Sequence, residues 1–205
     1  MDGFDTAQLV ALAAVLGFAS GIRLYAVLLV VGLVGYAGWV DLPAGLAVLS
    51  HPWVLAAAGA MFAIEFFADK VPAVDSLWDT VHTVIRIPAG AALAASVFGF
   101  GTAEGPDSAA WAMVMAIVGG TLAATSHFTK AGVRAAVNTS PEPVSNVVAS
   151  TAEDVLVGGL LALVLAYPLV ALGVVVVLLA IAGWLLPKLF RFLKRLFDRQ
   201  AGAPR

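Results

Sequence analysis

The sequence predicts an all-α membrane protein, a polytopic helix bundle with about six transmembrane segments. Of its 205 residues, 61% are hydrophobic and only 12% are charged, which gives a mean hydropathy of +0.99. Apolar runs of the length that crosses a bilayer, about 20 residues, recur along the chain. Lys and Arg are also absent from alternate loops, as in multi-pass proteins. This composition excludes a soluble globular domain, and the lack of Cys excludes disulfides and Cys-ligated metals.

We expect a single transmembrane domain over residues 1–187 and a basic amphipathic cytoplasmic tail over 188–205. The expected spans are 6–36, 53–69, 74–99, 109–129, 144–166 and 168–187. The first is too long for one straight crossing at about 1.5 Å per residue. The sequence "ASGIR" (19–23) interrupts it, since Ser20 and Gly21 favour the end of one half-helix and the start of the next. The first helix is therefore predicted to be broken.

The charges of the loops predict the orientation. The three loops expected on the outer side, 37–52, 100–108 and 167–168, contain no Lys or Arg. Basic residues gather at the opposite ends of the spans and in the tail, where they alternate with Leu and Phe at helical spacing. Positive charge favours the cytoplasmic side. We therefore expect a bacterial inner-membrane protein with both termini in the cytoplasm and a tail that lies in the headgroup layer.

A stripe of charged residues runs along the third span. Within "EFFADKVPAVDSLWDTVHTVIR" (65–86), the residues at i, i+4, i+7 and i+11 share one face of a helix. These residues are Asp75, Asp79, His82 and Arg86. Placing a single Asp or Arg at the centre of a membrane helix costs about 2.5 to 3.5 kcal/mol. We therefore expect the stripe to face the protein interior or a watery cavity.

The fifth span repeats this design with Asn146, Ser150 and Glu153, and with Asp154 beside them. The spans before these two stripes also correspond, because both end in charged residues followed by a polar connector. These residues are Glu65, Asp69 and Lys70 for the second span and His127, Lys130 and Arg134 for the fourth. We interpret the pattern as a weak internal repeat in which spans two and three match spans four and five. Small transporters often build such repeats around a polar centre.

Arg23 lies inside the first segment, at the predicted break. A half-helix N-terminus there adds positive potential, and a buried Arg needs a carboxylate partner, which we expect from the second, third or fifth span. The predicted pathway or substrate-binding residues are Arg23, Glu65, Asp69, Asp75, Asp79, His82, Arg86, His127, Lys130, Arg134, Asn146, Glu153 and Asp154. Two interpretations of these charges stay open. They line a pathway, or they only fix the packing of the helices.

Several segments, in this order, carry a resemblance to a known family. They read "GFASGIRLY", "ADKVPAVDSLWD…T…R.PAGA", "KAGVRAAVNTSPEPVSN" and "S.AEDVLV". Over about residues 8–166 the chain resembles the bacterial integral-membrane family catalogued as domain of unknown function four-one-two-six. The resemblance implies a shared membrane fold. It brings no activity, cofactor or catalytic residue with it.

The leading functional interpretation is a small transporter or channel whose pathway is lined by the two stripes and Arg23. Charges of both signs with a deep His are more typical of a proton-coupled carrier, whereas channels more often carry a ring of one sign. Three arginines and a broken-helix N-terminus favour an anionic solute. The ligand is expected to be a small solute or ion.

Two alternatives remain. One is a membrane enzyme acting on a lipid or polyprenyl phosphate, in which Asp75, Asp79 and His82 hold a divalent metal or act as acid and base. The other is a structural membrane subunit. No catalytic residue is assigned and an enzyme is the less favoured class. We expect no cofactor and no nucleic-acid partner, and we expect the protein to lie in a lipid bilayer. Whether it forms a homo-oligomer stays an open question.

Overall fold

The computed structural model describes residues 4–99, 106–139 and 143–201, and these are all-helical, with no strand. Its elements are α1 (Thr6–Tyr36), the short 3-10 helix η1 (Ala44–Ser50), α2 (Pro52–Ala68), α3 (Pro72–Ser96), α4 (Pro106–Val137), α5 (Pro143–Ala166) and α6 (Pro168–Ala201). Within the described part, α1, α4, α5 and α6 are long and apolar enough to cross a membrane. The pair of η1 and α2, bent by 70°, is a further candidate. The predicted all-α membrane bundle is confirmed, but the count of six spans is not.

Local sequence sets the helix starts. Asp5 caps α1, because its carboxylate accepts from the Gln8 backbone N–H at 2.8 Å and the Gln8 side chain accepts from the Asp5 N–H at 3.1 Å. Each helix from α2 to α6 begins at a proline, whose fixed φ suits the first turn and whose missing N–H is not needed there. The fourth span, predicted to end at 129, continues to Val137. The basic residues in this extension are paired with carboxylates and do not end the helix.

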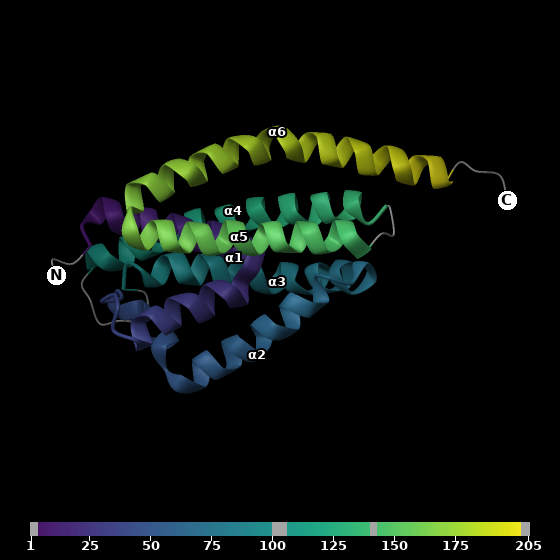
Figure 1. The fold of residues 1–205 in the computed structure, drawn as a ribbon. Coiled ribbons are helices and arrows are strands. Elements are labelled where there is room, and N and C mark those ends of the chain that lie inside the picture. The colour runs from purple at the N-terminus through teal and green to yellow at the C-terminus, as the bar shows by residue number, and fades with distance from the viewer. Residues whose placement is uncertain (1–3, 100–105, 140–142, 202–205) are drawn as a thin grey trace.

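Helix α1 enters the bundle, bends at Arg23 and returns. Arg23 has φ −141° and ψ 76°, outside the helical range, within an otherwise helical segment. Phe4 and Leu9, at the start of α1, line the same pocket as residues 41–44, which follow its end. Both ends of α1 therefore lie at one end of the bundle, and Figure 1 shows its second half running back. The predicted break is confirmed, and the helix stays a candidate membrane segment by its length and composition.

This bend changes the arrangement of the termini. Helices α2 to α6 run alternately between the two ends of the bundle, and α1 begins at the end opposite to the one where α6 finishes (Figure 1). We call these the N-terminal end and the C-terminal end. The start of α1 and the end of α6 therefore lie at opposite ends of the bundle, whereas the predicted orientation, with both termini in the cytoplasm, stays a prediction.

Glycines bring α1, α3 and α4 into backbone contact. A Cβ added at Gly17 would lie 2.7 Å from the Cα of Gly119 in α4, and one at Gly21 would overlap the carbonyl oxygen of Ala123. A Cβ at Gly90 in α3 would lie 2.5 Å from the Cβ of Ala123. Small residues permit this close approach of membrane helices. The contact holds the bend of α1 against the middle of α3 and α4.

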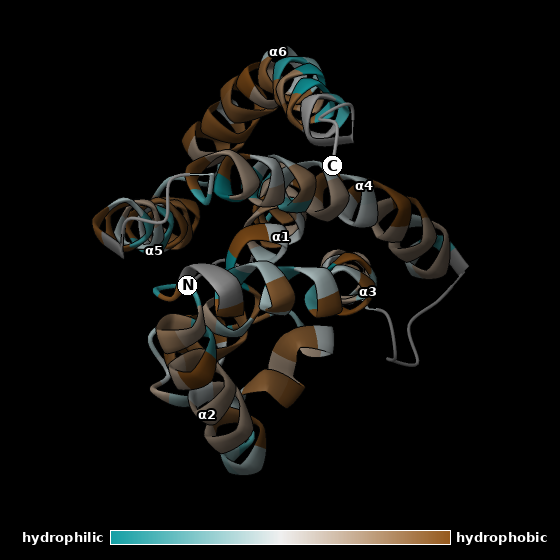
Figure 2. Ribbon diagram, turned by 90° about the vertical axis from the view of Figure 1, so that its right-hand side faces the viewer, coloured by the Kyte–Doolittle hydropathy of each residue, from teal (hydrophilic) through white to brown (hydrophobic). Residues whose placement is uncertain are grey.

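Helix α6 is continuous through Pro187, so the last span and the basic tail, predicted to divide at this residue, form one element. Its ribbon is gently curved (Figure 1), as a proline inside a helix favours. Its colour changes from hydrophobic brown to hydrophilic teal toward the C-terminus (Figure 2). The Lys188 ammonium lies 3.1 Å from the centre of the Trp184 ring at this change. This contact combines an aromatic ring and a cation of the kind found at membrane interfaces.

The predicted internal repeat stays a prediction. The pair of α2 and α3 and the pair of α4 and α5 both run to the C-terminal end of the bundle and back (Figure 1). Part of the connector between α4 and α5, residues 140–142, lies outside the described residues, as do residues 100–105 of the second predicted outer loop.

Candidate functional site

Buried charged side chains from α1 to α5 form a network around the bend of α1. All thirteen residues predicted from the sequence lie in or beside it. Glu153 and Asp154 have side chains that are 14% and 26% exposed, and the other eleven are buried. The apolar residues on the opposite face of α3 are 39–75% exposed, namely Leu77, Val81, Val84 and Ile85. The expectation that the α3 stripe faces the interior is confirmed.

Arg23 lies at the bend with its guanidinium fully buried. Its Nη1 pairs with Asp69, in the connector after α2, and its Nη2 donates to the Ser150 carbonyl at 3.0 Å and to the Ser150 hydroxyl at 2.8 Å. In α5, the Asp154 Oδ1 lies 3.1 Å from its Nε and the Glu153 Oε2 lies 3.5 Å from its Nη2. The expected carboxylate partner is confirmed. Arg23 thus joins the bend of α1 to α2 and α5.

Arg86 of α3 joins two other carboxylates. Its Nη2 donates to Glu65 Oε1 of α2 at 2.6 Å, and its Nη1 donates to Asp79 Oδ1, two turns earlier in α3, at 2.6 Å. All three residues are buried. Short, charge-assisted bonds of this kind are the stronger ones in proteins. They hold the stripe of α3 against α2.

Lys130 of α4 lies at the centre of the network. Its Nζ is 3.0 Å from Asp69 Oδ2, 3.3 Å from Asp79 Oδ1 and 3.4 Å from Glu153 Oε2. It also donates to the Ile22 carbonyl at 3.3 Å. Ile22 directly precedes the bend, where interruption of the helix leaves carbonyl groups without their usual helical partners. The ammonium therefore fills a cation position made by three carboxylates and one carbonyl.

Arg134, one turn further along α4, closes the network at the C-terminal end. Its Nε donates to Glu153 Oε1 at 2.8 Å, and its Nη1 donates to Asn146 Oδ1 at 2.9 Å. Its Nε also lies 3.9 Å from Asp75 Oδ1. Asn138, which was not among the predicted site residues, donates to Asp75 Oδ2 at 3.3 Å and accepts from Asn146. The two polar stripes on α3 and α5 are thus connected through α4.

The two histidines make defined hydrogen bonds at the edge of the network. His127 Nδ1 faces Arg86 Nη1 at 3.3 Å, and its Nε2 lies 2.8 Å from the Thr83 hydroxyl. An Arg nitrogen only donates, and the Thr83 hydroxyl already donates to the Asp79 carbonyl. These bonds are satisfied together by a neutral His127 that carries its proton on Nε2.

His82 does not join the metal set expected for the enzyme alternative. Its Nε2 lies 3.1 Å from the Tyr25 hydroxyl and its Nδ1 lies 2.9 Å from the Trp78 carbonyl. Sequence reasoning missed Tyr25 and Thr83. Tyr25 lies two residues after Arg23, and Thr83 lies one turn after Asp79. The sequence signal that could have identified them was their position close to a predicted site residue.

A recess of about 290 Å³ between α3 and α4 reaches the network. Its lining includes the hydroxyl residues Thr80 and Thr83, and it extends to Asp79, His127 and Arg134. The residues that line it come from the early part of α3 and the late part of α4, so it lies toward the C-terminal end of the bundle. This recess therefore gives an approach to the network from the C-terminal end.

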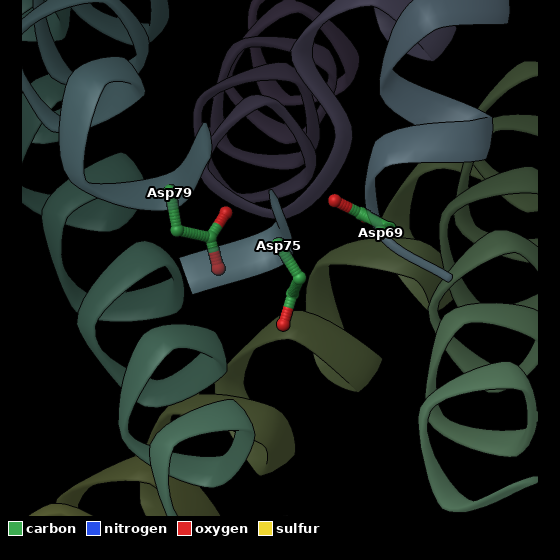
Figure 3. Close-up of side chains that lie close together, drawn as sticks. All are labelled: Asp69, Asp75 and Asp79. Atoms are coloured by element: carbon green, nitrogen blue, oxygen red, sulfur yellow. The ribbon is translucent and has the colours of Figure 1, made fainter. Parts of the chain in front are cut away.

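Three aspartates of the network lie close enough together to hold one metal ion. One carboxylate oxygen each from Asp69, Asp75 and Asp79 lies within 4.8 Å of the other two. Figure 3 shows Asp69 and Asp79 pointing toward each other, and Asp75 between them with its carboxylate directed downward in this view. Carboxylate oxygens are ligands for hard cations such as Mg²⁺ and Ca²⁺.

Comparison with known proteins agrees with the resemblance seen in the sequence. The profile of the family described as Domain of unknown function (DUF4126) matches residues 10–188. No curated protein and no solved structure matches the chain. The chain belongs to this family, and with its long apolar helices it is a membrane protein.

Proposed function

We propose that this member of the family is a membrane transport protein whose buried charge network forms the centre of the pathway. The bend of α1 carries the proposal. An interrupted helix inside a membrane protein is tolerated where its backbone is covered by protein or lines a cavity. Transporters place their substrate and ion sites at such interruptions. Here the interruption at Arg23 contacts carboxylates from two other parts of the chain, Asp69 and Glu153, and Lys130 binds the carbonyl of Ile22.

The charge balance of the network favours a cation or a proton over an anion. The ion pairs of the described residues join six carboxylates to four basic groups, and with the nearby Lys70 ammonium counted as well, the carboxylates remain in excess. The arginines that suggested an anionic solute, Arg23, Arg86 and Arg134, are each paired with carboxylates. An anionic ligand would add to this excess of negative charge. We therefore propose that transport depends on a cation or proton, with the transported solute unassigned.

We further propose that the C-terminal end of the bundle faces the cytoplasm of a bacterial inner membrane. The connectors at that end and the end of α6 carry the basic residues, and the loops at the other end lack Lys and Arg. The N-terminus then lies outside. The recess between α3 and α4 opens toward the cytoplasmic side in this orientation.

Cysteine accessibility tests whether the recess is a water-filled part of a pathway. The natural chain has no Cys, so a single introduced thiol reports alone. Thr83→Cys lies in the recess, whereas Val84→Cys, the next residue, lies on the outer face of α3 and is 75% exposed there. A charged methanethiosulfonate reagent should modify Thr83→Cys in inside-out vesicles and leave Val84→Cys unmodified, because lipid excludes the reagent. Lack of reaction at Thr83→Cys from both sides would favour a sealed structural core.

Flux through reconstituted vesicles tests the dependence on a cation or proton. Liposomes loaded with a pH-sensitive dye report proton movement after a gradient of Na⁺, K⁺ or Mg²⁺ is imposed, and isotopes of these ions report their own entry. We expect wild-type protein to move protons or one of these ions, and Asp79→Asn to abolish the movement. Asp107→Asn, at an exposed site at the start of α4, should behave as wild type. Wild-type vesicles no more permeable than protein-free vesicles would contradict the proposal.

A further inference from the structure

We propose that Asp69, Asp75 and Asp79 form a binding site for a divalent metal cation, and that the Lys130 ammonium competes with the metal for this site. The site itself is independent of transport, although its use as the ion that drives or accompanies the solute rests on the proposed function. Four observations support it: spacing, unsatisfied oxygens, charge balance and the position of Lys130.

The spacing of the three carboxylates fits a single ion. One oxygen from each lies within 4.8 Å of the others. Ca²⁺ binds oxygen at about 2.3 to 2.6 Å, so oxygens on opposite sides of one such ion are about 4.6 to 5.2 Å apart, and neighbouring ones are closer. The three residues come from the connector after α2 and from the first two turns of α3 (Figure 3).

Each carboxylate also has an oxygen without a hydrogen bond. Asp69 Oδ1, Asp75 Oδ1 and Asp79 Oδ2 are buried, and none has a hydrogen-bond partner among the described residues. The three residues are no more than 4% exposed. Buried polar atoms are nearly always bonded, and leaving them unbonded is unfavourable. A metal ion is a ligand that satisfies several carboxylate oxygens at once.

The charge of the network favours a cation. The six carboxylates of the ion pairs outnumber the four basic groups that they contact, so the region is negatively charged and favours a cation. Lys70 lies at the edge of this region, half-buried, where its ammonium bonds to the Ser150 hydroxyl and the Phe66 carbonyl. All the proposed ligands are oxygens, which selects hard cations over the softer metals that favour nitrogen or sulfur.

Lys130 is placed to exchange with the metal. Its ammonium contacts two of the three aspartates, Asp69 at 3.0 Å and Asp79 at 3.3 Å. It also has another partner in Glu153, 3.4 Å away, whose side chain is partly exposed. A metal that binds the aspartates repels the ammonium, which can then turn toward Glu153 and stay paired. Binding of the metal and movement of Lys130 in α4 are thereby linked.

Mn²⁺ binding to the full chain in detergent tests the site without a flux measurement. After treatment with a chelator, the protein is titrated with Mn²⁺, and the free ion is measured by electron paramagnetic resonance. We expect one Mn²⁺ per chain. Asp75→Asn should weaken binding about 10- to 100-fold, since even a partner of a metal ligand contributes this much. Asp75 is chosen because its nearest ion-pair partner is 3.9 Å away, so its loss disturbs the packing least.

Two further variants add a predicted increase in Mn²⁺ affinity and a control. Lys130→Gln removes the competing ammonium and should tighten Mn²⁺ binding. Asp107→Asn removes an exposed carboxylate at the start of α4, outside the network, and should bind Mn²⁺ as wild type does. Absence of Mn²⁺ binding, equal affinity in Asp75→Asn, or no gain in Lys130→Gln would each overturn the proposal. If Na⁺ stabilised the protein and Mn²⁺ did not, the site would be one for a monovalent cation, and this result would also overturn the proposal. Because flux is not involved, Mn²⁺ binding can hold even if transport fails.

Discussion

Replacing Arg23 by Ala is expected to destabilise the protein strongly. Arg23 is 0% exposed, pairs with Asp69 and donates two hydrogen bonds to Ser150. Removing one partner of a buried ion pair destabilises a protein by about 3 to 5 kcal/mol, because the other charge stays buried. Asp69 keeps Lys130 at 3.0 Å, and Asp154 is partly exposed, so we expect the lower part of this range, about 3 kcal/mol.

This loss is large enough to measure as a melting temperature. For a chain of this size, 1 kcal/mol corresponds to about 2 to 4 °C, so Arg23→Ala should melt about 6 to 12 °C below wild type. Arg23→Lys keeps the charge and loses the forked geometry, and should fall between the two. The assay is size-exclusion chromatography of detergent-solubilised protein after heating at a series of temperatures.

The matched control is Arg191→Ala in the exposed part of α6. Arg191 is exposed and donates to the Pro187 carbonyl of its own helix at 3.1 Å, and surface changes of this kind alter stability by about 0.5 kcal/mol or less. Arg23→Ala melting within about 2 °C of wild type would refute the reasoning. Water would then replace the guanidinium, and the charge at the bend would not be buried in the membrane-embedded protein.

Two other predictions concern packing and orientation. Gly21→Ala should lower the free energy of unfolding by about 1 to 3 kcal/mol, because the new methyl group overlaps the Ala123 carbonyl and the Ser126 hydroxyl. The control is Gly173→Ala, where an added Cβ meets nothing within 4 Å. This variant should be neutral or stabilising in the same melting assay. For orientation, an impermeant maleimide should label Trp39→Cys in intact spheroplasts and Thr139→Cys only after lysis, and an N-terminal epitope tag should be reached by antibody from outside. The reverse labelling would contradict the proposed topology.

The charged network was predictable from the sequence because its cost in lipid is high. Asp75, Asp79, His82 and Arg86 recur at helical spacing, and a helix with such a face has to turn it away from the acyl chains. The same reasoning anticipated a carboxylate partner for Arg23. The pairing itself was not predictable, since the geometry that lets Lys130 contact three carboxylates depends on how α2, α4 and α5 are placed around it.

The direction that α1 takes after its break was also not predictable from the sequence. Ser20 and Gly21 indicate an interruption, but the second half of the helix turns back because the whole chain packs around it. Backbone contact at Gly17 and Gly119 brings the first half beside α4. Hydropathy alone treats both halves as one long apolar segment and does not reveal that the second half runs back beside the first.

The bend of α1 constrains how the protein enters the membrane during synthesis. The first half of α1 leaves the ribosome before any of the carboxylates that pair with Arg23 have been made. Release of this arginine into lipid alone is unfavourable by about 2.5 to 3.5 kcal/mol, and its partners lie after α2 and in α5. The α1 hairpin is therefore the first part to be translated and among the last to settle. The α1 hairpin can pack against α3, α4 and α5 only once those helices have inserted. In a pulse-labelled nascent chain that stops before α4, α1 should therefore be accessible to protease.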